Sequence, residues 1–206
     1  MKTRHLLQLA TIAALAFVAG GCACCKESKS ASKPAAPLTE EEMNKRMMAA
    51  ATPGAPHKSL EVFAGNWDVA SKWWMAPEAP PMESKGASSK SWVMGGRFLK
   101  EDFSGDMMGT PFTGNGLSGY DNIKKKYNSL WVDSSSTGIF TSLGTVSADG
   151  KTFTYTSKMD DCMTGEMDKP VRFVITVISK DKHTFEMYEG AGAKEKKIGE
   201  MTYSRK

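Results

Sequence analysis

The sequence is poor in the side chains that build disulfide frameworks and nucleophilic active sites. After residue 25 it contains one cysteine, Cys162, and two histidines, His57 and His183. One cysteine forms no disulfide within the folded region, and no Cys–His pairing in the sequence activates it as a nucleophile. Adjacent carboxylates occur at 40–42 and 160–161, where helix capping and turn solvation explain them. Because no catalytic constellation is present, the sequence does not predict an enzyme.

Metal and cofactor sites are not predicted either. Cys24 and Cys25, next to Cys22, lack the separated ligand pairs that a zinc site needs. His183 follows a Lys-Asp-Lys turn, so we expect it at the solvent rather than as a haem ligand. The methionines would suit Cu(I), but they lack the repeated spacing and nearby histidines of copper sites. We predict that they fill the core or line a cavity: Met75, Met82, Met94, Met107 and Met108.

The charge balance gives no sign of a nucleic-acid partner. Lysines and arginines number 27 against 23 aspartates and glutamates, which gives a net charge of +4. The basic runs 124–126 and 194–197 are short, and they lack the clustered arginines and aromatics of a nucleic-acid stripe. We therefore predict solvated hairpin tips at both runs.

The N-terminus has the pattern of an export signal. A basic segment, 1–5, precedes an apolar run over 6–20 that is interrupted by only two polar residues. This run is too short, and too rich in small residues at its end, for a transmembrane helix. Residues 1–21 are therefore predicted to be a signal peptide of the lipoprotein type.

The residues at the end of this signal indicate where the protein goes. Small residues directly before Cys22 predict that this cysteine is acylated and becomes the membrane-anchored N-terminus. Ala23 then favours an outer-membrane anchor that faces the periplasm. The alternative is ordinary cleavage near Gly21, which would leave a free periplasmic or secreted protein.

Two short segments separate the signal from the folded region. Residues 22–37 are rich in Ser, Lys, Ala and Pro and are predicted to form a flexible tether. Residues 38–57 are predicted to hold a short helix and a Pro/Gly linker, with Thr39 as the N-cap and Glu42 at the capping-box position. The helix has one apolar face, which either lies on the folded domain, caps its mouth or stays free: Met43, Met47 and Ala50.

Residues 58–206 read as short β-strands separated by turn signals. The first strand opens at Gly65-Asn66-Trp67, and nine further strands are expected after it. About ten strands with no helix between them predict an all-β fold, an antiparallel up-and-down barrel or a sandwich. The further strands are placed near Glu83–Met94, Arg97–Ser104, Phe112–Tyr120, Lys126–Asp133, Gly138–Ser147, Thr152–Lys158, Val171–Ser179, Thr184–Glu189 and Lys196–Ser204.

Gly65 and Trp67 are predicted to close one end of the barrel. The indole covers the end, and the glycine lets the entering chain pass close beneath it. A closed barrel of this size either fills its interior with side chains or holds one small ligand. The sequence thus predicts a container without naming its contents.

An ordered set of motifs over about 58–206 resembles the bacterial family labelled domain of unknown function 1579. The resemblance implies a lipocalin-like, calycin-type barrel, and it implies no activity. The motifs include Gly95-Gly96-Arg97-Phe98-Leu99, Gly119-Tyr120-Asp121-Asn122, Trp131-Val132-Asp133-Ser134, Phe185-Glu186-Met187-Tyr188 and Tyr203-Ser204-Arg205-Lys206.

Strand alternation suggests three places where polar and aromatic side chains share a face. These combinations are typical of small-molecule pockets, although barrel-end salt bridges and rim charges would show the same pattern. We predict a small apolar or amphipathic ligand, with a packed structural or interaction module of the cell envelope as the alternative. The candidate ligand residues are Arg97 with Glu101, which would pair with each other, Trp131 with Asp133, and Glu186 with Tyr188.

Overall fold

The computed structural model describes residues 37–76, 79–107 and 109–206. The predicted signal peptide (1–21), the acylation site Cys22 and almost all of the predicted tether lie outside the described residues. Met108 also lies outside them.

The first helix, α1 (Glu40–Ala51), begins where the sequence predicts. Thr39 is the N-cap, and its hydroxyl accepts a hydrogen bond from the Glu42 backbone N–H at 3.2 Å. The second hydrogen bond of a capping box, from the Thr39 backbone N–H to the Glu42 side chain, does not form. The Glu42 carboxylate instead accepts a hydrogen bond from the Arg46 guanidinium at 2.9 Å. None of the residues of α1 is buried. No helix within the described ranges has the length and apolar character needed to cross a membrane.

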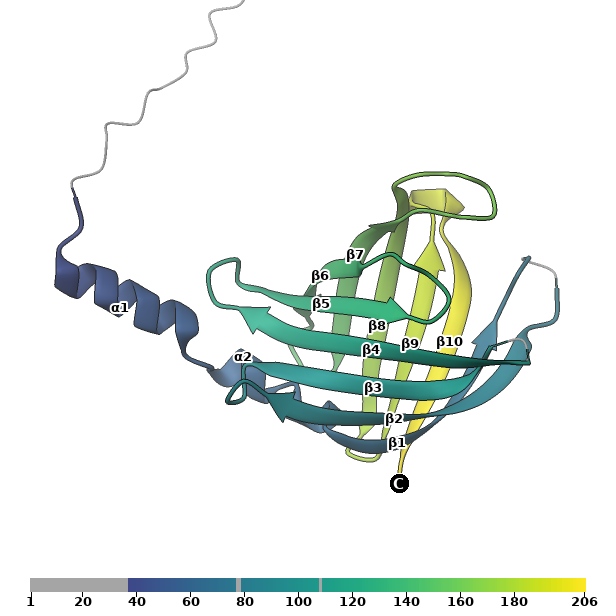
Figure 1. Ribbon diagram of the computed structural model, residues 1–206, viewed down its shortest axis with the longest axis horizontal. Helices are drawn as coiled ribbons and strands as arrows, with labels where there is room; N and C mark the ends of the chain where they lie inside the picture. Colours follow the sequence, from purple (N-terminus) through teal and green to yellow (C-terminus); the bar gives the residue numbers. More distant parts are fainter. Residues whose placement is uncertain (1–36, 77–78, 108) are drawn as a thin grey trace, which may run out of the picture. The chain divides into compact units, whose positions relative to one another are not determined.

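The C-terminal end of α1 is attached to the barrel through one side chain. The amide of Asn122, in the turn between the fourth and fifth strands, donates to the backbone carbonyls of Ala49, Ala50 and Thr52. This turn lies at the end of the barrel opposite the loop 160–168, where the barrel has its mouth. The helix α1 therefore does not cap the mouth (Figure 1). A short second helix, α2 (Ala55–Lys58), and a 3₁₀ turn, η1 (Glu61–Phe63), then lead into the first strand.

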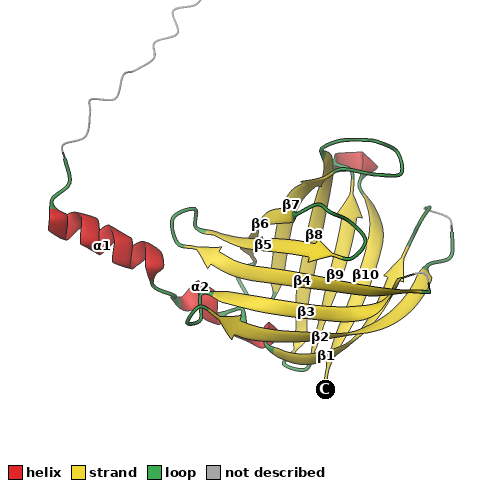
Figure 2. Cartoon of the chain, viewed as in Figure 1, coloured by secondary structure: helices red, strands yellow, loops and turns green. Residues whose placement is uncertain are grey.

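Ten antiparallel strands close into a barrel, which settles the choice between barrel and sandwich (Figures 1 and 2). Neighbours along the chain pair with each other, and β1 pairs with β10 to complete the circle, so no sheet edge is exposed. The all-β prediction is confirmed. The strands are β1 (Gly65–Trp73), β2 (Met82–Val93), β3 (Phe98–Met107), β4 (Thr110–Asp121), β5 (Lys126–Asp133), β6 (Phe140–Val146), β7 (Thr152–Met159), β8 (Lys169–Ser179), β9 (Lys182–Glu189) and β10 (Lys196–Arg205).

Trp67 lies at the closed end of the barrel and is fully buried. Its indole N–H donates to the Phe63 carbonyl at 2.9 Å, which joins β1 to the 3₁₀ turn before it. Gly65 has φ +115°, and a Cβ at this position would collide with the guanidinium of Arg205. Only glycine therefore suits the position.

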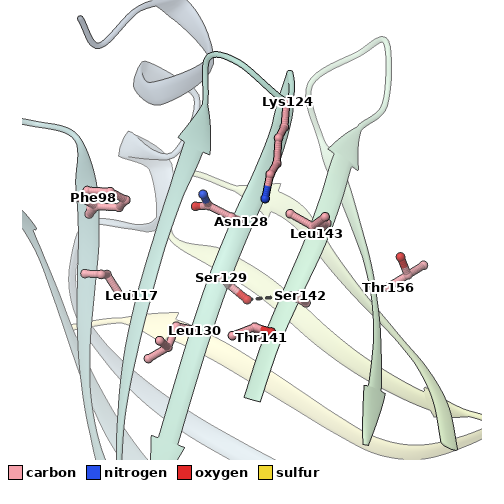
Figure 3. Close-up of a pocket in the computed structure, with 10 residues that line it drawn as sticks. All are labelled: Phe98, Leu117, Lys124, Asn128, Ser129, Leu130, Thr141, Ser142, Leu143 and Thr156. Carbon is pink, nitrogen blue, oxygen red and sulfur yellow. Dashed lines mark hydrogen bonds between the residues drawn. The ribbon is translucent and has the colours of Figure 1, made fainter. Parts of the chain in front are cut away.

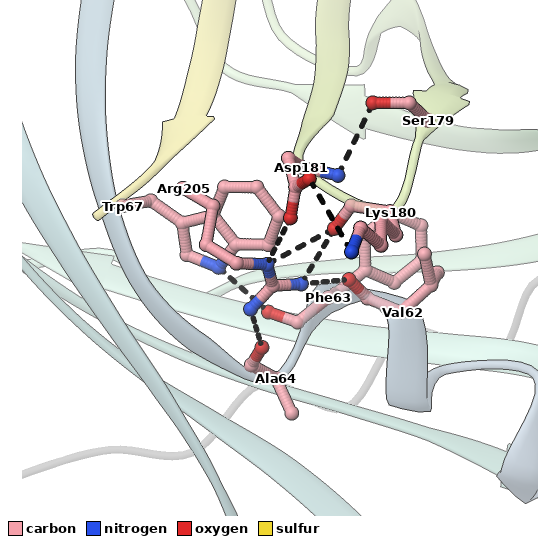
Figure 4. A network of polar contacts seen from close by, with 8 residues as sticks. All are labelled: Val62, Phe63, Ala64, Trp67, Ser179, Lys180, Asp181 and Arg205. Carbon is pink, nitrogen blue, oxygen red and sulfur yellow. Dashed lines mark hydrogen bonds and ion pairs between the residues drawn. The ribbon is translucent and has the colours of Figure 1, made fainter.

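Arg205, on the last strand, joins the N- and C-terminal segments of the closed end (Figure 4). Its guanidinium donates to the carbonyls of Ala64 at 2.7 Å, Val62 at 3.0 Å and Lys180 at 2.9 Å. It also lies 4.1 Å from the Trp67 ring centroid, a cation–π contact. One planar side chain thus satisfies three carbonyls from two distant segments.

The core fills the closed end of the barrel. It is built from inward-facing aromatic and aliphatic side chains that include Leu60, Phe63, Leu99, Tyr127 and Phe153, all buried. Leu60 and Phe63 come from the segment before β1 and pack beneath the barrel.

The structure corrects the prediction for His183. It is 2% exposed rather than at the solvent, because β9 begins at Lys182 and its alternation turns His183 inward. The imidazole stacks on Tyr203 with ring centroids 4.4 Å apart, and it meets Trp67 and Phe63 edge to face.

Candidate ligand site in the barrel interior

The barrel interior has two different halves. In the closed half, which ends at Trp67, the core side chains are buried, and the half-buried inward-facing side chains, such as Trp92 and Phe185, pack against that core. In the open half, toward the loop that joins β7 to β8, many inward-facing side chains are only half-buried although they point to the barrel axis. An interior packed with side chains would bury them, so the open half is accessible to solvent. The half-buried inward residues are Trp73, Met82, Phe103, Phe112, Trp131, Phe140, Met187 and Met201.

A polar cluster lies on the inner wall between the two halves. Ser88 donates to the Glu101 carboxylate at 2.6 Å, and the Lys90 ammonium lies 3.4 Å from the same carboxylate. The Lys90 and Glu101 side chains are 10% and 18% exposed. The ammonium also lies 4.4 Å from the Tyr203 ring centroid. A buried charge is costly unless it is paired. Here the ammonium of Lys90 is paired with the carboxylate of Glu101.

The strand register brings this cluster beside an aromatic residue of the open half. Lys90 pairs with Glu101, Glu101 with Gly116, and Gly116 with Trp131, so one row of residues crosses four strands. The absent side chain of Gly116 leaves room for both neighbours, because a Cβ there would lie 3.3 Å from atoms of each.

Trp131 is held in position by Asp133. The indole N–H donates to the Asp133 carboxylate at 2.9 Å, and that carboxylate also accepts from the Ser135 backbone and hydroxyl. Burial by itself would raise the pKa of Asp133, but the hydrogen bonds from Ser135 and Trp131 lower it overall. Asp133 therefore stays ionised and fixes the orientation of the ring.

The six predicted ligand residues do not form one site. Glu101, Trp131 and Asp133 lie on the inner wall. Arg97 lies in the exposed turn between β2 and β3, where its guanidinium donates to the Met94 carbonyl at 3.0 Å. The predicted Arg97–Glu101 pair is wrong, because β3 begins only at Phe98 and Lys90 takes the place of the arginine.

Glu186 and Tyr188 do share a face, but it is the outer face of the barrel. The Tyr188 hydroxyl donates to Glu186 at 3.2 Å, and the Lys197 ammonium contacts the same carboxylate at 3.2 Å. Arg172 covers the Tyr188 ring at 4.1 Å and forms a bidentate pair with Glu195. This network attaches the loop between β9 and β10 to β8, and it faces away from the interior.

Sequence reasoning missed Lys90, Ser88 and His183. For the first two a signal existed, because Ser88, Lys90 and Trp92 alternate on one face of β2 with Ser84 and Gly86. Because this series ends in the large apolar residue Trp92, its pattern indicates that the whole face points into the barrel. The methionine prediction was partly wrong, since Met82 and Met107 face inward but Met75 and Met94 are exposed.

Charged side chains form a second cluster at the mouth. Lys169, at the start of β8, contacts Glu189 at 2.9 Å and Asp161 at 3.0 Å. These hydrogen bonds raise the pKa of Lys169 and hold the pKa of Asp161 below its usual range. The cluster ties the loop after β7, which carries the exposed Cys162, to the barrel wall. In the described part of the chain, no three His, Cys, Asp or Glu side chains are grouped closely enough to hold a metal ion.

A different depression, the outer hollow, lies over the outer faces of β3 to β7 (Figure 3). It has a volume of about 610 Å³ and opens widely to solvent. Apolar side chains from neighbouring strands form its floor, with Lys124 at one end: Phe98, Leu117, Leu130 and Leu143. It is separated from the interior by the sheet.

Comparison with models of protein families shows to which family the chain belongs. The model of the family described as "Protein of unknown function (DUF1579)" matches residues 52–205. The chain belongs to this family. The match confirms the resemblance found in the ordered motifs. The part of the chain that matches the DUF1579 model contains α2, η1 and the whole barrel. No curated protein matches the sequence.

Solved structures similar to this DUF1579 chain are β-barrels. The crystal structure of Rv2717c from M. tuberculosis aligns over 75% of this chain and 99% of its own, with 12% identity and a TM-score of 0.53. A redesigned β-barrel covers 72% of this chain and 95% of its own, with 15% identity and a TM-score of 0.37. The structure of EF1p2_mFAP2b bound to DFHBI covers 74% and 100%, with 11% identity and a TM-score of 0.41. At these identities the likeness to Rv2717c concerns the fold.

Proposed function

We propose that this protein is a container that holds one small apolar or amphipathic molecule in the open half of its barrel. One observation carries the proposal: inward-facing side chains such as Phe103 and Met201 are only half-buried. These side chains border the buried core around Trp67. Apolar walls with a few convergent polar groups are the usual composition of small-molecule sites.

The polar group of such a molecule would meet Lys90. Among the described residues the Lys90 ammonium forms no hydrogen bond, and its one ion pair, with Glu101, is 3.4 Å long. An ammonium carries three N–H donors, so this cluster retains capacity to donate to a ligand oxygen. The apolar part of the ligand would then lie toward the mouth, among the half-buried aromatic and methionine side chains.

Filling the open half should abolish binding, and β2 offers a matched pair of variants. Ser84 faces inward and Lys85 faces outward on the same strand. We expect wild type and Lys85→Trp, equilibrated with an organic extract of the host envelope, to show a discrete added mass by native mass spectrometry, and Ser84→Trp to show none. If wild type shows no added mass, or if Ser84→Trp retains it, the interior is not a ligand site.

We further propose that the protein is exported and anchored to the outer membrane through acylated Cys22. The support is the basic segment, apolar run and small residues before Cys22 in the sequence. A Cys22→Ala variant should lose at least about 90% of its membrane association in a fractionation assay, because stable anchoring depends on the acyl chains. A Cys24→Ala variant should stay with the membrane. Retention of Cys22→Ala in the membrane fraction would contradict the anchor.

A second candidate function, an envelope interaction module, is supported by the outer hollow. Leu117, Leu130 and Leu143, together with Phe98, form an apolar strip on the outer face. Exposed apolar patches that are rimmed by polar residues are typical of protein interaction sites. The mass-spectrometry experiment separates the two candidates, since a packed module retains no ligand in either the wild type or the Ser84→Trp variant.

A further inference from the structure

We infer that the ligand is a flat molecule with an aromatic or conjugated ring system, which stacks face to face on aromatic rings of the inner wall. This inference rests on the proposed function and adds the class of ligand. It is carried by the way in which three rings of the open half lie on glycines: Trp73, Phe103 and Trp131.

Trp131 lies flat on strand β4. One edge of its indole covers Gly114, where a Cβ would collide with Cζ2, Cη2 and Cε2, and the opposite edge covers Gly116, 3.3 Å from Cε3. Contact of two opposite edges with two glycines of one strand places the ring plane parallel to the wall. The hydrogen bond to Asp133 holds it there.

Phe103 and Trp73 repeat this arrangement on other strands. Phe103 covers the facing glycines of β2 and β3, since a Cβ would lie 2.7 Å from its ring at Gly86 and 3.1 Å at Gly105. Trp73, on β1, covers its cross-strand partner Gly199 on β10.

A ring that lies flat on the barrel wall leaves the interior open, whereas a ring that points to the barrel axis fills it. In the closed half, the Phe63, Tyr127 and Phe153 rings meet edge to face and fill the interior. In the open half, Phe103 also meets Trp131 and Phe112 edge to face, but these rings are only half-buried. The glycines beneath Phe103 and Trp131 let these two rings lie on the wall, so part of each ring face stays open to the interior. Exposed ring faces favour offset stacking with a planar π system, which contributes beyond the area that it buries.

The matched probes are anthracene-9-carboxylate, which is flat and aromatic, and tetradecanoate, which has similar size and the same charge but a flexible aliphatic chain. Each is titrated into the full-length protein by calorimetry. Hydrophobicity alone predicts tighter binding of tetradecanoate, because it buries more apolar surface. We expect the opposite order, with anthracene-9-carboxylate binding about tenfold more tightly through stacking.

Adjacent tryptophans provide the control variants. Trp73 faces inward, whereas Trp74 lies on the outside, where the Lys197 ammonium is 5.4 Å from its ring centroid. Trp73→Leu and Trp131→Leu should each weaken anthracene-9-carboxylate binding by about fivefold to tenfold, with less than about a twofold change for tetradecanoate. Trp74→Leu should change neither, and Trp131→Phe, which keeps a ring, should retain most of the affinity.

Three results would overturn the inference. They are equal or tighter binding of tetradecanoate, an equal loss of both probes in Trp73→Leu and Trp131→Leu, and an aliphatic molecule as the mass retained from the host extract. In each of these cases the container function stands and only the ligand class is wrong. If neither probe binds and no mass is retained, the proposed function fails together with the inference.

Discussion

Replacing His183 by phenylalanine is expected to remove about 2 kcal/mol of the destabilisation that mild acid causes in this protein. The imidazole is 2% exposed, and neither of its nitrogens finds a hydrogen-bond partner within the described residues. Burial lowers its pKa from 6.5 to about 2, and the nearby cations Lys90 and Arg205 lower it in the same direction. His183 therefore stays neutral in the folded protein at every physiological pH.

The direction of the pH effect follows from proton uptake. Below its ordinary pKa of 6.5, His183 binds a proton in the unfolded chain but not in the folded protein, so the free energy of unfolding falls as the pH falls. One pH unit corresponds to about 1.4 kcal/mol, which amounts to about 2 kcal/mol between pH 6.5 and about pH 5. The contribution is complete above pH 6.5 and is lost progressively toward the folded-state pKa of about 2.

Urea unfolding at about pH 7.5 and about pH 5 measures this effect. The loss of unfolding free energy between the two pH values should be about 2 kcal/mol smaller in His183→Phe than in wild type. His183→Leu, which has no ring, should show the same reduction, because the effect depends on titration and not on packing. His57, whose pKa is also lowered by burial, is present in all three proteins and cancels. Equal pH dependence in wild type and both variants would contradict a neutral buried His183.

Arg205→Lys is expected to lower the free energy of unfolding by about 3 kcal/mol, a large effect for a substitution that keeps the charge. The guanidinium donates to the carbonyls of Ala64, Val62 and Lys180 at once, and its plane lies over Trp67. An ammonium is a point charge and cannot reach three carbonyls in this planar arrangement. At least one carbonyl at the closed end then loses its partner, and the cation–π contact weakens. The side chain is 29% exposed, so water recovers part of the loss.

The control for this prediction is Arg46→Lys. Arg46, on α1, forms one exposed i,i+4 pair with Glu42, and its substitution should change the free energy of unfolding by less than about 0.5 kcal/mol. Chemical denaturation at neutral pH compares the two variants with wild type. A loss for Arg205→Lys no larger than that for Arg46→Lys would show that the guanidinium fork does not stabilise the closed end.

The strand pattern was predictable because each strand of a closed antiparallel barrel has one face toward the core and one toward water. Trp67, Val69 and Ser71 alternate with exposed residues along β1 just as their polarity suggests. Turn residues placed the boundaries well where the turn is tight, as between β6 and β7 at 147–151. Prediction was poorer for Arg97, because alternation does not say at which residue a strand starts after a four-residue turn.

The candidate site was less predictable than the fold. Alternation shows that two residues share a face, but it does not show which face is inside when both faces carry mixed side chains. This is why Glu186 and Tyr188, on the outer face, could not be separated from Trp131 and Asp133, on the inner one. His183 was misplaced because its neighbours in the sequence are charged, whereas its neighbours in space are aromatic.

By itself the sequence determined the all-β class, the closing role expected of a tryptophan at the first strand, and membership of the DUF1579 family. These follow from local periodicity, turn chemistry and ordered motifs, all of which can be read along the chain. Only the tertiary structure decided that the closed half is packed and the open half is accessible, and that Lys90 pairs with Glu101 beside Trp131. Those features depend on the register across three successive hairpins and on what fills the barrel; register is set by turn geometry together with the face that becomes buried, and alternation within a single strand does not report it.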